Sequence, residues 1–350
     1  KNKFIYLAIL AAGFASCEPE FENEVNANYS AGDADFTTYV AVGNSLTAGY
    51  MDGTVSRGGQ AYSYPNLLAQ QFALVGGGEF TTPFMADNIG GFSSGGVQIP
   101  QFGPRLFLAP GNVPTPVSGV SGTDISTKLT GSFNNFGIPG AKSVHLDFAG
   151  YGSSAGNPYF ARMASNPMAT VVDDALAGSP TFFSLWIGNN DVLGYATSGG
   201  AGTNQTGNLN PATYGANDIT DPTVFAGVYN TLVDQLTANG AKGVVANLPY
   251  VTTIPYFTTV PYNPVPLNAT AAGQLNAGFA AYNNGLLFAQ SNGLLTAAEV
   301  ARRTITFSAS STNALLITDS YLTNLTSFGI PSLRQATSED LIVLPARNVI

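Results

Sequence analysis

TYVAVGNSLTAG, residues 38–49, joins an apolar run to a turn that holds a serine between glycines. Residues 38–42 are β-branched or apolar and end at Gly43, which is typical of a parallel strand buried on both faces. Ligands and nucleophiles in open α/β sheets lie beyond the carboxyl ends of such strands. The stretch therefore predicts a buried strand that carries Ser45 to the functional edge of a sheet.

Further strand and helix patterns alternate along the chain. Residues 65–75 have apolar side chains at helical spacing, residues 181–187 (TFFSLWI) predict a second buried strand that ends in glycine, and residues 243–248 predict a third. Strands and helices joined by glycine-rich crossings indicate an α/β protein with helices on both faces of a mainly parallel sheet.

The clearest helical pattern covers residues 222–239. Asp221 is the expected N-cap, Pro222 occupies the first helical position and Gly240 ends the helix. Its apolar face comprises Val224, Phe225, Val228, Leu232 and Leu236.

The amino-acid composition limits the kinds of binding and catalysis that the chain can support. Of the 350 residues, 45% are hydrophobic, and 12 Lys and Arg stand against 21 Asp and Glu, a net charge of −9. No basic cluster forms a stripe that would neutralise phosphates, so nucleic-acid binding is disfavoured. One Cys and one His exclude a disulfide within the chain, a Cys-rich zinc site and a multi-histidine metal cage. We expect no metal and no organic cofactor, and chemistry by hydroxyls, carboxylates, amides and backbone.

Residues 1–17 have the parts of an export signal. Two lysines precede an apolar run over 4–15, too short to span a bilayer, and small residues then lead to Cys17. The ending FASC resembles a bacterial lipobox, which implies lipidation of Cys17 and a membrane anchor. The alternative is a plain secretory signal with an incidental cysteine. Residues 18–36 are acidic and polar, which predicts a solvated tether. We expect an exported protein, lipid-anchored to the cell envelope at the outer membrane or cell surface.

Two long segments interrupt the alternation of strands and helices. Residues 76–130 are rich in Gly, Pro, Ser and Phe, and residues 194–220 in Gly, Asn and Thr. Long loops in a compact domain are usually functional or mobile, so rim or lid elements and ordered decoration are both open interpretations. The aromatic residues of 250–262 either line an apolar acyl pocket or pack within a loop.

Three glycine-bearing turns follow one another in a suggestive order: GNSLTAG at 43–49, NFGIPG at 135–140 and GNND at 188–191. In this order they resemble the first three blocks of the SGNH hydrolases, also called GDSL-type lipases and esterases. The resemblance implies a three-layer α/β/α sandwich of flavodoxin-like architecture over residues 37–350. It implies Ser45 as the nucleophile, and the N–H groups of Ser45 and Gly140 with the Asn190 amide as an oxyanion hole. Asp191 is expected to brace its loop.

Two departures from the family pattern stand out. Asn44 replaces the usual Asp before the serine, which removes one charge but retains hydrogen-bonding capacity. The family's D-x-x-H block, which supplies the catalytic His and its Asp, does not occur in residues 1–350. A serine hydroxyl is a poor nucleophile without a base. We expect that the chain stops before this block. The alternatives are a displaced base, His145 oriented by Asp147, or a protein that only binds; a packed or capping role is the default for His145.

The combined interpretation is a serine esterase or lipase-type acylhydrolase that cleaves carboxylic esters through an acyl-Ser45 intermediate. Its partners would be an ester substrate in a lipid, a glycan or a small molecule, and the membrane through its anchor. The alternative is a surface lipoprotein that binds glycan or lipid without catalysis.

Overall fold

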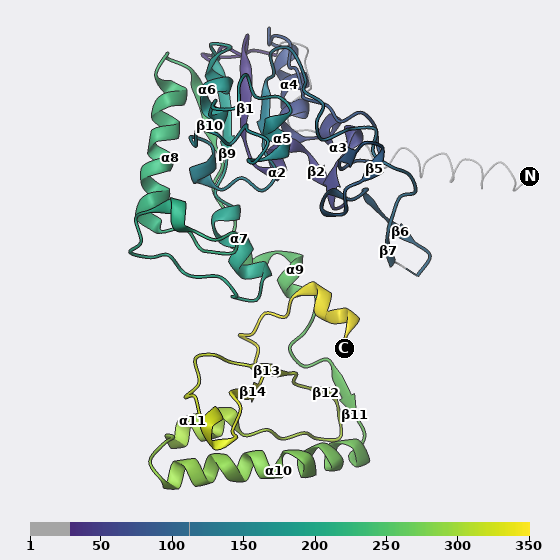
Figure 1. Cartoon of the computed structure of the whole chain (residues 1–350), viewed down its shortest axis with the longest axis vertical. Helices are drawn as coiled ribbons and strands as arrows, with labels where there is room; N and C mark the ends of the chain where they lie inside the picture. Colours follow the sequence, from purple (N-terminus) through teal and green to yellow (C-terminus); the bar gives the residue numbers. More distant parts are fainter. Residues whose placement is uncertain (1–28, 112) are drawn as a thin grey trace, which may run out of the picture. The chain divides into compact units, whose positions relative to one another are not determined.

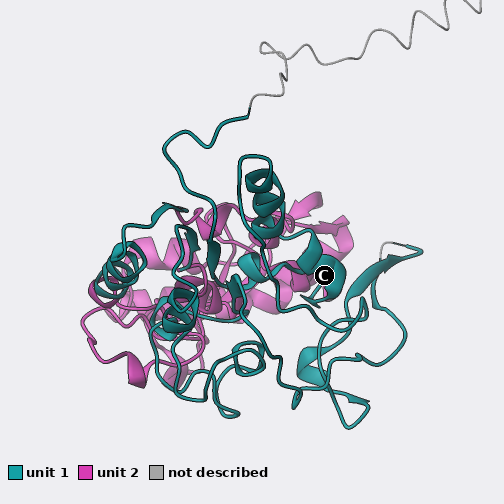
Figure 2. Ribbon diagram, turned by 90° about the horizontal axis from the view of Figure 1, so that it is seen from above, with its two compact units in different colours: residues 1–187, 226–246 teal, residues 188–225, 247–350 magenta. Residues whose placement is uncertain are grey.

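The computed structural model describes residues 29–111 and 113–350, which form a mixed α/β structure with a four-stranded parallel sheet. The predicted signal peptide, Cys17 and most of the tether lie outside these residues. The chain divides into two compact units, residues 1–187 with 226–246, and residues 188–225 with 247–350 (Figure 2). The single domain over 37–350 stays a prediction.

The parallel sheet belongs to the first unit and has the order β10-β9-β1-β8 (Figure 1). Its strands are β1 (Tyr39–Gly43), β8 (Asn135–Gly137), β9 (Phe182–Trp186) and β10 (Lys242–Val245). The register pairs Gly43 with both Gly137 and Trp186, so β8, β1 and β9 end at the same level. β1, β9 and β10 confirm the predicted strands. β8 is a strand where the sequence indicated only a turn.

Both faces of β1 are covered by apolar side chains, which explains its unbroken apolar run. On one face, Tyr39 and Ala41 pack with residues of helix α4, including Phe72, whose ring centroid lies 5.0 Å from that of Tyr39. On the other face, Val40 and Val42 join a larger core with residues of α6 and α8. Helices therefore contribute to the core on both sides of the sheet.

Most helices that contribute to the first unit begin at side-chain caps that the sequence supplies, although α8 starts in residues 222–225 of the second unit. Asp221 accepts hydrogen bonds from the N–H groups of Thr223 and Val224, so the predicted start of α8 is confirmed. The helix ends at Thr237, two residues before the predicted end, and Gly240 follows with φ of +81° and donates its N–H to the Thr237 carbonyl at 2.9 Å. The helices are α2 (Ser45–Ala48), α3 (Arg57–Ala61), α4 (Tyr64–Ala73), η2 (Ser143–His145), α5 (Pro158–Ala161), α6 (Val171–Leu176) and α8 (Pro222–Thr237).

Residues 76–130 form short antiparallel pairs despite their lack of periodicity. Together with the pair that follows α2, the elements are β2 (Tyr50–Met51), β3 (Thr54–Val55), β4 (Ser93–Ser94), β5 (Val97–Gln98), η1 (Pro100–Phe102), β6 (Leu106–Ala109) and β7 (Val113–Pro116).

The second unit combines one long helix with short elements. The helices are α7 (Asn190–Thr197), η3 (Pro211–Thr213), η4 (Val251–Thr253), α9 (Pro255–Thr258), α10 (Ala269–Ser291), α11 (Ala297–Arg303), η5 (Thr326–Phe328) and η6 (Leu344–Asn348). The strands are β11 (Val265–Leu267), β12 (Ser310–Asn313), β13 (Leu316–Thr318) and β14 (Leu333–Gln335).

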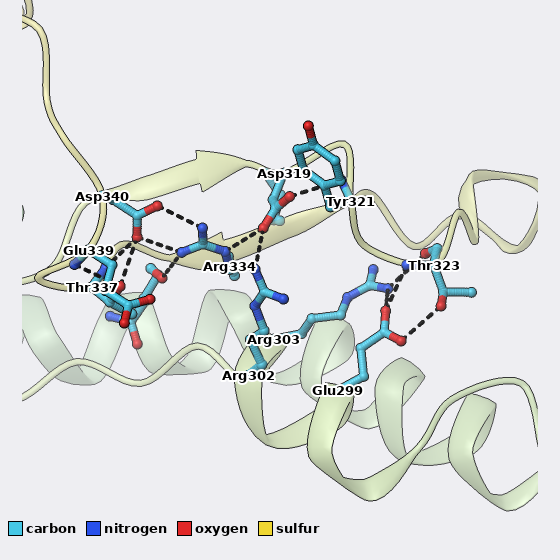
Figure 3. A network of polar contacts seen from close by, with 12 residues as sticks. Glu299, Arg302, Arg303, Asp319, Tyr321, Thr323, Arg334, Thr337, Glu339 and Asp340 are labelled. Carbon is cyan, nitrogen blue, oxygen red and sulfur yellow. Dashed lines mark hydrogen bonds and ion pairs between the residues drawn. The ribbon is translucent and has the colours of Figure 1, made fainter. Parts of the chain in front are cut away.

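Arginine side chains tie these short elements together (Figure 3). The fully buried Arg303 pairs with Glu299 and donates to the carbonyl oxygens of Thr323 and Pro331 at 3.0 and 2.8 Å. Arg334 on β14 donates to Asp319 and makes two 2.7 Å hydrogen bonds to Asp340. Buried arginines therefore join the helix α11 and the strand β14 to the loops around them through both local and more distant contacts.

Candidate active site

Ser45 begins helix α2, two residues beyond the end of the central strand β1. Asn44 is fully buried and caps this helix, because its side-chain oxygen accepts the Leu46 N–H at 3.1 Å. An amide thus provides a hydrogen bond to the backbone at the position where the SGNH pattern has an aspartate. Gly49 ends α2 with φ of +78°, a conformation that favours glycine. The serine is therefore held in a short, tightly bounded turn at the carboxyl edge of the sheet.

Two glycines at the strand ends allow α2 to lie directly against the sheet. A β-carbon on Gly137 would overlap the backbone of Thr47 and Ala48, and one on Gly43 would overlap the Thr47 hydroxyl and the Trp186 carbonyl. Asn135 of β8 also donates to the Thr47 carbonyl at 3.0 Å. This close approach fixes the distance between the Ser45 turn and the strand that leads to Gly140.

Gly140 lies in the turn after β8, at the same edge as Ser45. The Ile138 N–H donates to the Gly43 carbonyl at 2.9 Å, which ties this turn to the end of β1. The Asn157 side chain donates to the Pro139 carbonyl at 2.8 Å and accepts the Tyr159 N–H, so it joins the turn to the start of α5. Gly140 itself has φ of +82° and is exposed.

Two backbone donors at this edge have no acceptor. Among residues 29–111 and 113–350, neither the N–H of Ser45 nor that of Gly140 donates a hydrogen bond. The Ser45 hydroxyl likewise has no hydrogen-bond partner in the described part of the chain. Unpaired backbone N–H groups beside a serine are the donors that an oxyanion needs.

Behind α2, a hydroxyl pair connects this helix to α4. Thr47 Oγ1 lies 3.1 Å from the Tyr64 hydroxyl, and the Tyr64 ring lies 5.6 Å from the Trp186 ring at the end of β9. Burial raises the pKa of Tyr64, so its hydroxyl stays protonated at neutral pH. Thr47 and Tyr64 therefore position the Ser45 turn without adding charge.

His145 has a structural environment in the first unit. Its Nδ1 accepts the Lys142 N–H at 3.0 Å across the short helix η2, and its ring stacks on Tyr151 with centroids 4.8 Å apart. These contacts are those of a capping and packed histidine, the default that the sequence indicated. The Ser45 hydroxyl makes no hydrogen bond to His145 or to any other described residue.

Asn190 and Asp191 belong to the second unit, where they begin helix α7. Asp191 is buried, and its carbonyl accepts the Thr220 N–H at 3.0 Å, which braces the α7 turn against the segment before α8. The structure thus brings Ser45 and Gly140 together within the first unit. The oxyanion role of Asn190 stays a prediction.

No protein-family model, curated protein or solved structure matches this chain. Within the described residues, no cluster of three or more His, Cys, Asp and Glu could hold a metal ion, and none of the helices there has the length and apolar character needed to cross a bilayer.

Sequence reasoning missed Asn157 and Tyr64. Asn157 precedes Pro158, a pattern that signals a helix start and was available in the sequence. Its second contact, with the Pro139 carbonyl, depends on the folded chain. The same holds for Tyr64, which is 17 residues from Thr47.

Proposed function

We propose that this protein is a serine acylhydrolase of the SGNH type, which cleaves carboxylic esters through an acyl-Ser45 intermediate. The observation that carries the proposal is the pair of unpaired N–H groups, on Ser45 and Gly140, beside a serine hydroxyl at the carboxyl edge of the sheet. Such donors stabilise the negative oxygen of a tetrahedral intermediate, and each is worth about 10²–10³ in rate.

The strand order supports the finer fold proposed here, a flavodoxin-like three-layer sandwich. Counted along the chain, the four strands have the order 2-1-3-4, the order in which a flavodoxin-like sheet begins. The chain passes to opposite sides of β1 when it forms β8 and β9, and ligands in such sheets bind at this switch point. Ser45 follows the strand at which the switch occurs.

The proposed reaction follows from these positions. Ser45 Oγ attacks the carbonyl carbon of the ester while a base takes its proton. The carbonyl oxygen becomes negative and accepts hydrogen bonds from the N–H groups of Ser45 and Gly140, and from the Asn190 amide. Collapse expels the alcohol, which regains a proton, and water then releases the acid by the same steps in reverse. In the SGNH family the base is the histidine of the D-x-x-H block.

A fluorophosphonate probe tests the nucleophile, because only an activated serine reacts quickly with it. We expect labelling of the full-length protein at Ser45, and loss of both labelling and p-nitrophenyl ester hydrolysis in Ser45→Ala. Ser154→Ala is the matched control, since Ser154 is exposed and lies in a GSSAG sequence that resembles a hydrolase elbow. Retention of most activity in Ser45→Ala would contradict the assignment of Ser45 as the nucleophile.

Asn190→Ala tests the third donor. Loss of an oxyanion donor costs about 2.7–4 kcal/mol of transition-state stabilisation, so kcat should fall about 10²–10³-fold. An unchanged kcat would remove Asn190 from the site while leaving Ser45 and Gly140 in it.

A non-catalytic surface lipoprotein that binds glycan or lipid is the second candidate. It is favoured by one observation: within the described residues the Ser45 hydroxyl has no hydrogen-bonded base. Absence of labelling in the full-length protein, together with retention of an acylated glycan or lipid, would decide for this candidate.

We also propose export and lipidation at Cys17, supported by the lipobox-like sequence FASC at 14–17. Cells fed an alkyne-tagged fatty acid should incorporate it into the wild-type protein and not into Cys17→Ser. Equal incorporation of the fatty acid into both proteins would contradict lipidation at Cys17 and favour a plain secretory signal.

A further inference from the structure

A cavity of about 210 Å³ lies beside Gly140 in the first unit. Pro139 and Gly140 form one wall, the β2–β3 pair contributes Tyr50, and α5 contributes Tyr159. The remaining wall is Gln101 and Phe102 of η1, inside the long segment 76–130. One of the two unpaired backbone donors of the candidate active site therefore borders a cavity that opens to solvent.

Aromatic rings build the walls and hold one another in place. Phe102 meets Tyr159 edge to face, with centroids 5.8 Å apart, and Phe92 packs against both rings from behind. The Tyr50 hydroxyl is occupied, because it donates to the Gly53 carbonyl at 2.6 Å. The cavity is therefore shaped before any ligand arrives.

The lining is uncharged. Its residues are aromatic, glycine, proline, threonine and glutamine, and burial raises the pKa of Tyr159 to about 12, so this hydroxyl is neutral at physiological pH. A charged group would lose its hydration there without a compensating partner. The cavity suits a small, neutral and largely apolar group.

We propose that this cavity receives the acyl group of the ester and restricts it to a short chain. The inference rests on the proposed function and adds a substrate class to it. At about 30 Å³ for each water-sized group, 210 Å³ holds roughly seven non-hydrogen atoms. Acyl chains of two to about six carbons fit this space, and the long chains of membrane lipids do not.

The acyl half, and not the alcohol half, belongs in a preformed cavity with fixed walls. The alcohol must leave before water reaches the acyl-Ser45 intermediate, so its side of the site has to open to solvent. The acyl group stays bound through both steps. A cavity walled by fixed rings next to an oxyanion donor is therefore suited to the half that remains.

Direct binding tests the cavity independently of catalysis. In full-length protein carrying Ser45→Ala, which cannot form the acyl intermediate, saturation-transfer NMR should detect methyl butyrate. Adding Gln101→Trp should abolish this signal, because the exposed Gln101 can be enlarged into the cavity without disturbing the core. Adding Gln71→Trp, an exposed glutamine on α4 outside the cavity, should leave it unchanged. Equal signals in all three proteins would overturn the proposal.

Chain-length profiles test the same cavity in the active enzyme. With Ser45 present, kcat/KM for p-nitrophenyl butyrate should exceed that for the palmitate, and Gln101→Trp should lower the butyrate value about tenfold or more, as filling a pocket of this kind does. Gln71→Trp is again the control. If Gln101→Trp leaves the dependence of kcat/KM on acyl-chain length unchanged, the cavity does not bind the acyl group. The proposed esterase activity would be unaffected by that result.

A second ester series separates the two halves of the substrate. Butyrates of methyl, hexyl and dodecyl alcohols should be cleaved with similar kcat/KM if the acyl group occupies the cavity. A steep fall along this series, with tolerance of long acyl chains, would assign the cavity to the alcohol instead. The full-length protein could also bind methyl butyrate, lose this binding in Gln101→Trp and yet hydrolyse no ester. That result would support the cavity as a binding site and contradict the proposed esterase activity.

Discussion

Buried arginines are satisfied in different ways in the two units. In the first unit, Arg162 donates to the carbonyl oxygens of Pro83 and Phe84 at 2.8 and 2.7 Å and has no carboxylate partner among the described residues. In the second unit, Arg303 and Arg334 each pair with carboxylates. Backbone dipoles therefore stabilise the buried arginine of the first unit, whereas ionised acids stabilise those of the second.

The pKa values follow the same division. Burial lowers the pKa of Arg162 to about 10, while hydrogen bonds to Asp340 raise the pKa of Arg334 above its ordinary value. Paired charges are stable only while the acids stay ionised. Acid and salt should therefore weaken the second unit before they weaken the sheet that carries Ser45.

Removal of a buried charge should give the largest effect. Arg303→Met leaves the carbonyls of Thr323 and Pro331 without their donor and removes the cation that pairs with Glu299, and breaking a buried ion pair in this way costs about 3–5 kcal/mol. Urea unfolding should show this loss. The neighbouring Arg302→Met is the control: its side chain is 53% exposed, and exposed pairs contribute at most about 1 kcal/mol. Similar losses in both variants would contradict the comparison.

A methyl group at the strand end should disturb the first unit nearly as much. The β-carbon of Gly137→Ala would overlap backbone atoms of Thr47 and Ala48, and overpacking of this kind costs about 1–3 kcal/mol. Because α2 must move, fluorophosphonate labelling of Ser45 should also slow. Gly227→Ala, in open space on the exposed side of α8, should instead stabilise by about 0.5–1 kcal/mol. Unimpaired labelling in Gly137→Ala would show that the close approach is not needed.

Local sequence patterns were sufficient to predict the larger helices and strands of the first unit. β1, β9, β10, α4 and α8 each carry an apolar pattern or a cap that can be recognised within a few residues. β8 was missed because Asn135, Phe136 and Gly137 are too few to show a period, and its pairing with β1 comes from residues almost a hundred positions away. The turns with Ser45 and Gly140 were predicted because glycines bound them.

The sequence predicted few of the helices and strands of the second unit. Its stabilising pairs join Arg334 to Asp319 and Arg303 to Pro331, 15 and 28 positions apart, and no local pattern specifies such partners. The cavity beside Gly140 was missed for the same reason, since Tyr50, Phe102 and Tyr159 meet only in the folded chain. The sequence had instead pointed to the aromatic residues of 250–262, which lie in the second unit.

Acid should act through Asp340. Hydrogen bonds from Arg334 lower the pKa of this carboxyl from 3.8 to about 2, so its stabilisation is complete above pH 4 and is lost as the pH falls through 2. After allowance for solvent screening, roughly 1–2 kcal/mol is at stake. Urea unfolding at pH 7 and pH 2 should show that Asp340→Asn removes this part of the pH dependence. Glu339→Gln, an exposed neighbour, should leave it unchanged; an equal loss in both would exclude Asp340 as the source.

The smallest effect should come from the hydroxyl pair behind α2. Thr47→Val removes the hydrogen bond to Tyr64, worth about 0.5–1.5 kcal/mol, while Gly43 still allows the side chain to lie against the strand. The chain's single tryptophan, Trp186, stacks near Tyr64, so its fluorescence reports directly on this contact. We expect a shifted emission, slower Ser45 labelling and a loss of stability no larger than the worth of this hydrogen bond, and Thr47→Ser should restore all three. If Thr47→Val and Thr47→Ser behave alike, the hydrogen bond between Thr47 and Tyr64 does not position Ser45. The glycines at the strand ends would then set its position alone.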